Sequence, residues 1–234
     1  MLAVAALLLA PHTVSAQGPY PPGAAGYDIS WPQCGGPYPA LGGGTFGIVG
    51  VNDGMPGTSN PCFAGELAWA QQNDALAGIY LNEAYGTSVD GPENCELGDR
   101  ACLAYNYGWV TAEYGYVTAL ANSGGATDSV HNWWLDVEIG NTWDDGTYLN
   151  GRVIQGSLDY FQDVQGIQAG VYSVGDMWSQ IAGAYAPAGV PNWIAGGADA
   201  SDTGTCGRTL WPGAAPAIFQ TLTPDGNYDL DIGC

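Results

Sequence analysis

The sequence predicts a single α/β domain built on parallel strands. Three observations support this. Strand-like and helix-like stretches alternate along the 234 residues, 46% of the residues are hydrophobic, and no linker-like segment divides the chain. Parallel strands need crossover connections, usually helical, so the alternation leaves two architectures, a closed α/β barrel or a doubly wound open sheet.

Each predicted element follows from its local pattern. Short apolar runs that lie between turn residues are typical of buried strands, and the chain has them at 26–30, 46–51, 77–81, 132–139, 170–173, 193–195, 217–221 and 229–232. Apolar residues at helical spacing predict helices at 66–72, 103–121, 153–164 and 176–182. The intervening loops are rich in Gly, Pro, Asp and Asn, as turns require.

The N-terminal segment indicates export from the cell. Residues 1–9 form an apolar run, and small residues at 14–16 precede Gln17, the pattern of a secretory signal peptide over 1–16. We expect a short Pro/Gly-rich stalk at 17–25 and the barrel domain at 26–234. A buried N-terminal helix is the alternative, which Pro11 opposes. The predicted location is therefore secreted and extracellular.

Six cysteines fit an oxidising compartment and up to three disulfides. The sequence allows fifteen pairings, and we expect neighbours along the chain to pair: Cys34–Cys62, Cys95–Cys102 and Cys206–Cys234. A zinc site is the competing interpretation. It is weak because there is no Cys-x-x-Cys pair, and the chain after the signal keeps only His131.

The charge excludes several classes of partner. With 23 acidic residues against 3 arginines and no lysine, the formal net charge is −20. Such a chain cannot neutralise a nucleic-acid backbone, and it is disfavoured at an anionic membrane. No phosphate-binding glycine loop and no Gly-x-Ser-x-Gly elbow is present, and the acidic stretch 225–231 lacks the terminal Glu of a calcium loop. We therefore expect no cofactor, no metal and a monomeric protein.

Carboxylates at strand ends are the strongest functional signal. Asp136 and Glu138 end an apolar strand and, two residues apart, project to one face. Asp28 lies in the first strand, and Asp229 and Asp231 alternate in the last, so a closed barrel would bring them to one mouth. Two carboxyl groups with separated pKa values supply the acid and the stabiliser of glycoside hydrolysis. The alternative is that these acids only make turn and cap hydrogen bonds.

The order of these motifs resembles glycoside hydrolase family 25, the lysozyme-like muramidases. The resemblance covers nearly the whole mature chain and is carried by Gly26-Tyr27-Asp28-Ile29-Ser30, Phe46-Gly47-Ile48-Val49, Leu135-Asp136-Val137-Glu138, Gly170-Val171-Tyr172-Ser173, Trp193-Ile194-Ala195, Phe219-Gln220 and Asp229-Leu230-Asp231. It implies an irregular (β/α) TIM-like barrel and a hydrolase that cleaves cell-wall polysaccharide by carboxylate acid catalysis.

The resemblance also implies residue roles. Glu138 would be the catalytic acid, and Asp136 would support it and position a substrate N-acetyl group. Asp28 and Asp229 would complete the acidic floor. The substrate-binding residues would be Tyr80, Tyr172 and Trp193, stacking on sugar rings, with Gln220 and Asp231 from the closing strands. For the aromatic residues, core packing is an equal alternative.

Cleft positions depart from the family pattern, and the departures leave the substrate open. The third strand runs Tyr80-Leu81-Asn82 where the family usually has a Tyr-His pair, and Phe219 and Thr221 replace the usual Trp and Tyr beside Gln220. Peptidoglycan is anionic and would be repelled by a net charge of −20. A different bacterial or environmental polysaccharide is therefore the second candidate substrate, and a non-catalytic glycan-binding domain is the second candidate function.

Overall fold

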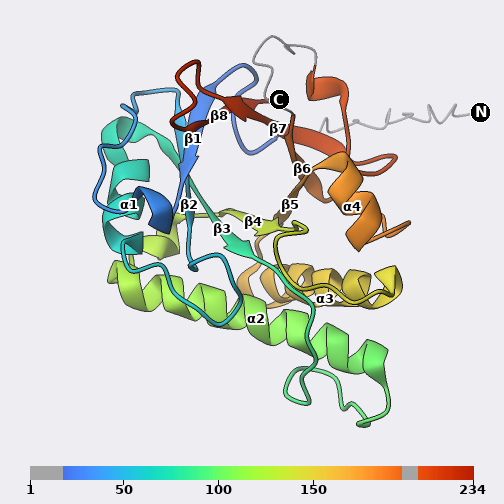
Figure 1. Ribbon diagram of the computed structural model, residues 1–234. Coiled ribbons are helices and arrows are strands. Elements are labelled where there is room, and N and C mark those ends of the chain that lie inside the picture. The colour runs from blue at the N-terminus through green and yellow to red at the C-terminus, as the bar shows by residue number, and fades with distance from the viewer. Residues whose placement is uncertain (1–17, 197–204) are drawn as a thin grey trace, which may run out of the picture.

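A computed structural model describes residues 18–196 and 205–234 (Figure 1). Eight strands close into one barrel in chain order: β1 Ala25–Ile29, β2 Phe46–Gly50, β3 Leu76–Asn82, β4 Asn132–Asp136, β5 Gly170–Ser173, β6 Pro191–Ala195, β7 Ala215–Leu222 and β8 Asp229–Gly233. The first seven strands run parallel, and β8 is antiparallel to both β7 and β1. The predicted irregular TIM-like barrel is confirmed, and all eight predicted strands are present within a few residues. The predicted signal peptide, 1–16, lies outside the described residues.

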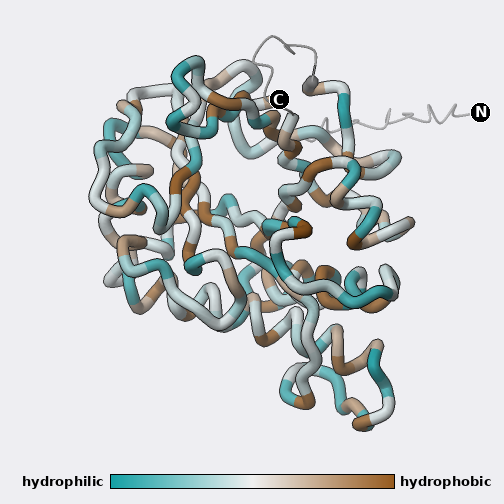
Figure 2. Tube along the Cα trace, in the orientation of Figure 1, coloured by the Kyte–Doolittle hydropathy of each residue, from teal (hydrophilic) through white to brown (hydrophobic). Residues whose placement is uncertain are grey.

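Four helices connect the strands from β2 to β6: α1 Phe63–Ala70, α2 Arg100–Ser123, α3 Thr147–Tyr160 and α4 Gly175–Ile181. The long helix α2 starts where the Asp99 side chain accepts a hydrogen bond from the backbone N–H of Cys102, and it ends at Gly124, whose φ of 61° is left-handed. In Figure 2 hydrophilic and hydrophobic residues are interspersed along α2, as expected of a helix with one solvated face.

Glycines let the backbones of helices α2 and α3 come into direct contact where the two helices cross. A Cβ atom added to Gly108 would lie 1.9 Å from the carbonyl oxygen of Val153, and one added to Gly156 would lie 2.0 Å from that of Tyr105. No larger residue fits at either position without moving a helix, so these two glycines set the helix–helix distance.

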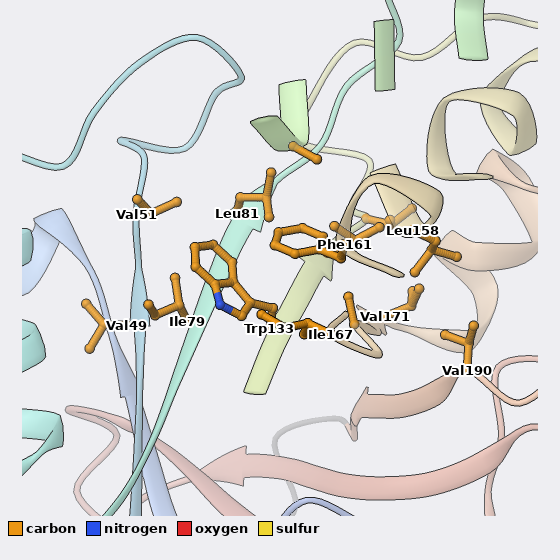
Figure 3. Packing of buried hydrophobic residues seen from close by; sticks show 14 of the residues in the cluster. Val49, Val51, Ile79, Leu81, Trp133, Leu158, Phe161, Ile167, Val171 and Val190 are labelled. Carbon is orange, nitrogen blue, oxygen red and sulfur yellow. The ribbon is translucent and has the colours of Figure 1, made fainter. Parts of the chain in front are cut away.

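The main hydrophobic core lies between the strands and the helices. Figure 3 shows Trp133 among Ile79, Leu81 and Phe161, and the Trp133 and Phe161 rings are 4.9 Å apart between centroids. These four side chains are at most 1% exposed. Burial on this scale supplies the main stabilising free energy of the domain.

A second, aromatic cluster fills the barrel itself. Phe46 and Trp134 occupy the interior, and a Cβ atom on Gly26 or Gly170 would lie 2.3 Å or 2.2 Å from the respective ring. Glycine in the neighbouring strand therefore makes the room that each large ring needs. Tyr20 is 1% exposed and stacks on Phe46 at 4.0 Å. Within the segment expected to be a stalk, 17–25, Tyr20 therefore packs into the barrel domain.

Three disulfides join Cys34 to Cys62, Cys95 to Cys102, and Cys206 to Cys234. The expected pairing of neighbours is confirmed. Each bond closes a short loop, which restricts the unfolded chain and stabilises the domain. Within the described ranges, no helix has the length and apolarity needed to cross a membrane.

Candidate active site

The carboxyl ends of the strands bring the predicted acids together. Asp28 and Asp136 lie at or next to the last residues of β1 and β4, and Glu138 follows two residues after Asp136. Asp229 is the first residue of β8, and because β8 is antiparallel its first residue pairs with Asp28 at the same barrel end. The antiparallel direction of β8 therefore brings Asp229 to the same end of the barrel as the other three acids.

These acids open onto one small pocket of about 140 Å³. Its lining consists of residues that were all predicted as site residues: Asp28, Tyr80, Asp136, Glu138, Tyr172, Trp193, Gln220 and Asp229. The ninth predicted residue, Asp231, is fully buried and lies below the pocket lining, where it accepts a 2.9 Å hydrogen bond from the indole Nε1 of Trp193. Trp193 is 2% exposed, so its ring is part of the pocket floor and offers little free face to a sugar.

A hydrogen-bond chain fixes one wall of the pocket. The Tyr172 hydroxyl donates to Gln220 Oε1 at 2.9 Å, and Gln220 Nε2 donates to Asp28 Oδ2 at 2.8 Å. The amide of Gln220 can satisfy both partners in only one orientation, because its oxygen accepts while its nitrogen donates. This chain holds Asp28 and Tyr172 in place before any ligand binds.

Asp136 has one occupied and one free oxygen. Asn82 Nδ2 donates to Asp136 Oδ2, while Asp136 Oδ1 has no hydrogen-bond partner although the residue is only 6% exposed. Asn82 is itself held by Asn52, whose side chain bonds the Asn82 backbone N–H at 3.1 Å and its carbonyl at 3.2 Å. A buried oxygen without a partner is costly unless a ligand or water fills the position.

Burial and mutual repulsion raise the pKa values of the whole group. Burial, with the Asp229 carboxylate next in importance, raises the pKa of Asp28 to about 7. Burial, followed by Glu138 and then Asp28, raises the pKa of Asp136 well above its ordinary value. The pKa of Glu138 is also raised by burial, and the nearby Tyr172 hydroxyl opposes this shift. The group therefore retains protons in a pH range where isolated carboxyls are ionised.

Two of the three arginines pair with acids outside the pocket. Arg100 pairs with Asp144, and Arg152 lies 3.6 Å from Glu93. None of the eight pocket-lining residues is basic. The acids are thus held by burial, protonation and neutral hydrogen-bond partners.

Sequence reasoning missed two residues next to the pocket. Asn82 was noted only as a departure from the family, yet it bonds Asp136; its i+2 relation to Tyr80 along β3 would have predicted a shared face. Glu83 is fully buried behind the strands, both its carboxyl oxygens lack partners, and burial raises its pKa to about 8. No sequence signal separates Glu83 from an ordinary loop acid.

The other constellations considered from sequence give no second site. His131 is exposed directly before β4, as expected for a residue at the start of a strand. In the stretch 225–231, Asp225 accepts hydrogen bonds from Thr223 and Asn227, which is a compact turn. Within the described part of the chain, Glu93, Cys95 and Cys102 lie close enough for a metal, but both cysteines are consumed by their disulfide.

Comparison of the sequence with family models gives no match, and neither does comparison with curated proteins. Comparison of the fold with solved structures gives clear matches. A muramidase from Trichobolus zukalii aligns with a TM-score of 0.60 and 18% identity over 90% of this chain and 93% of that one. A family GH25 lysozyme from Aspergillus fumigatus aligns with 0.59 and 16% over the same shares. The spore cortex lytic enzyme SleM from Clostridium perfringens aligns with 0.63 and 13% over 90% and 67%.

Sequence identities in this range are evidence of a shared fold and not of a shared activity. The alignments extend over nearly all of this chain. The eight strands of this chain close into a barrel in chain order. The chain therefore has the fold of the family 25 glycoside hydrolases.

Proposed function

We propose that the protein is a secreted glycoside hydrolase that cleaves a cell-wall polysaccharide, with peptidoglycan as the first candidate substrate. One observation carries the proposal: four carboxyl groups line a pocket at the carboxyl ends of the strands, where barrels of this type carry their active sites. The fold is shared with proteins described as muramidases and lysozymes, which supports the same chemistry. Three disulfides are consistent with an oxidising, extracellular location.

In this proposal Glu138 is the general acid. Its raised pKa keeps a proton on the carboxyl in mildly acidic conditions. Glu138 gives that proton to the oxygen of the glycosidic bond as the bond to the anomeric carbon breaks. The ionised Glu138 can then take a proton from the attacking water, which restores its starting state.

Asp136 positions the substrate. Its free Oδ1 faces a buried position without a partner and can accept the N–H of a substrate acetamido group. Held in this way, the acetamido carbonyl oxygen can attack the anomeric carbon as the leaving group departs, and water then opens the resulting ring. Asp28 and Asp229 line the same pocket, and their carboxyl oxygens place negative partial charge near the developing oxocarbenium ion.

The test compares wild type with Glu138→Gln on purified peptidoglycan, with new reducing ends as the readout. Loss of the acid is expected to lower kcat by roughly a hundredfold or more. Glu113→Gln, on the exposed face of α2, is the matched control and should keep full activity. Circular dichroism of all three proteins checks that each is folded.

The same assay separates the alternatives. Release from a neutral glycan but not from peptidoglycan would keep the mechanism and change the substrate. Binding without release, equal in wild type and Glu138→Gln, would identify a glycan-binding domain and refute the catalytic proposal.

A further inference from the structure

Trp31 is the exception among the tryptophans. All nine lie in the described residues, and eight are buried or half-buried, whereas Trp31 is 47% exposed. An indole is the largest apolar side chain, and leaving its face in water forgoes hydrophobic stabilisation. Its indole is therefore a free apolar face that a ligand can cover.

The turn that carries Trp31 is rigid. Residues Trp31–Gln33 form a short 3-10 helix directly after β1. The Gln33 side chain accepts a 3.0 Å hydrogen bond from the backbone N–H of Ser30, and the disulfide from Cys34 ties the turn to Cys62. An aromatic ring on a fixed turn binds a partner at a smaller cost in conformational entropy than one on a flexible loop.

This turn adjoins the catalytic pocket. A Cβ atom on Gly50 would lie 2.7 Å from Ser30 Cβ and 2.8 Å from Cζ of Tyr80, which lines the pocket, so Ser30 packs next to the pocket wall. Trp31 is the next residue. The loop after β2 passes beside the indole at Gly54, and Met55 on that loop is 57% exposed.

We propose that Trp31 is a second sugar subsite that binds a neutral pyranose ring of the same glycan chain whose bond is cleaved in the pocket. This rests on the proposed function. A flat apolar indole face suits the axial C–H face of a pyranose. The strongly negative chain, with the exposed Asp53 on the adjoining loop, disfavours a sugar that carries a carboxylate. The subsite therefore suits the N-acetylglucosamine units of an alternating wall polymer and holds a long chain across the barrel mouth.

The kinetic test uses long, peptide-free peptidoglycan strands and the variants Trp31→Ala and Trp31→Phe. Trp31→Ala is expected to raise KM roughly tenfold while kcat is unchanged, and Trp31→Phe, which keeps a flat ring, to restore most of the affinity. Tyr114→Ala is the matched control, because Tyr114 is 46% exposed on α2, and it should behave as wild type. An unchanged KM in Trp31→Ala, or a fall in kcat alone, would overturn the subsite.

A binding test separates this inference from the proposed function. In the Glu138→Gln background, the same strands should shift the fluorescence of the exposed indole to shorter wavelength and protect it from N-bromosuccinimide. Neither effect should occur when Trp31 is also replaced by Phe. Absence of both effects, with peptidoglycan hydrolysis by wild type intact, refutes the subsite alone. Absence of hydrolysis with both effects present refutes the proposed catalysis alone.

Discussion

Glu83 gives the sharpest prediction about stability, because it is a buried acid that is not part of the pocket. Its side chain is fully buried, both carboxyl oxygens lack partners, and burial raises its pKa from 4.5 to about 8. The backbone N–H of Glu83 bonds the carbonyl of Asp136 at 2.9 Å, and Ser157 of α3 lies close to its carboxyl. The residue is therefore held between the barrel and the helices in its protonated form.

The direction and size of the effect of pH on the free energy of unfolding follow from the difference between the pKa values of Glu83 in the folded and unfolded states. A carboxyl whose pKa is raised on folding binds its proton more tightly in the native state, so it contributes stability below its unfolded pKa. That contribution is lost as the pH rises from about 4.5 to about 8, where the native state loses its proton. The difference between 4.5 and about 8, at about 1.4 kcal/mol for each pH unit, corresponds to about 5 kcal/mol.

The assay is urea unfolding of wild type and Glu83→Gln at pH 4.5 and pH 8.5, with the disulfides intact. Glutamine has the same shape and no charge, so the free energy of unfolding of Glu83→Gln relative to wild type should increase by about 5 kcal/mol between the two pH values. Glu113→Gln, at an exposed position of α2, should leave the pH dependence of wild type unchanged. Parallel pH profiles for wild type and Glu83→Gln would refute the reasoning, since they would mean that Glu83 is not protonated in the native state.

Two further predictions test the helix crossing and the pocket. Gly108→Ala places a Cβ atom 1.9 Å from the Val153 carbonyl oxygen and should destabilise the protein by about 3 kcal/mol in urea unfolding. Gly65→Ala on α1, where a Cβ meets nothing within 4 Å, should instead stabilise by about 0.5 kcal/mol, and equal effects of the two would contradict the close packing. Asp229→Asn removes a charge that raises the pKa of Asp28, so the Asp28 carboxyl, followed by ¹³C NMR, should titrate below about 7; an unchanged titration would mean that burial alone sets it.

The elements that could be predicted from the sequence are those with strong local patterns. The apolar run that leads to Asp136 predicted a strand, and the structure has β4 there, with Glu138 two residues beyond its end. Helix α3 begins at Thr147, six residues before the predicted start at 153, because Asn150, Gly151 and Arg152 interrupt the apolar spacing on which the prediction depended. Boundaries of this kind depend on packing and not on local propensity.

The sequence predicts which residues form the site better than it predicts how deeply each of them is buried. Alternation along strands brings Asp28, Asp136 and Glu138 to one face, and the structure places all three in one pocket. The same rule places Asp231 on the inward face of its strand, but it does not say how deep in the barrel the residue lies. In the structure Asp231 is fully buried below the pocket lining. The burial of Glu83 and Tyr20 depends on segments distant in the sequence, which no local pattern reports.

The antiparallel direction of the last strand, β8, explains why so many carboxyl groups meet at one end of this barrel. In a fully parallel barrel the residues at the mouth are all strand ends, followed by loops that can turn away. Here β8 enters the barrel at the mouth, so Asp229 stands opposite Asp28 in direct register and Asp231 follows two residues deeper. Burial raises the pKa of both Asp28 and Asp231, and the nearby charge of Asp229 raises both further. No basic side chain in the pocket lining offsets this repulsion, so protonation relieves it. The arrangement costs stability at neutral pH, and it keeps transferable protons beside Glu138, which is what the proposed acid catalysis needs.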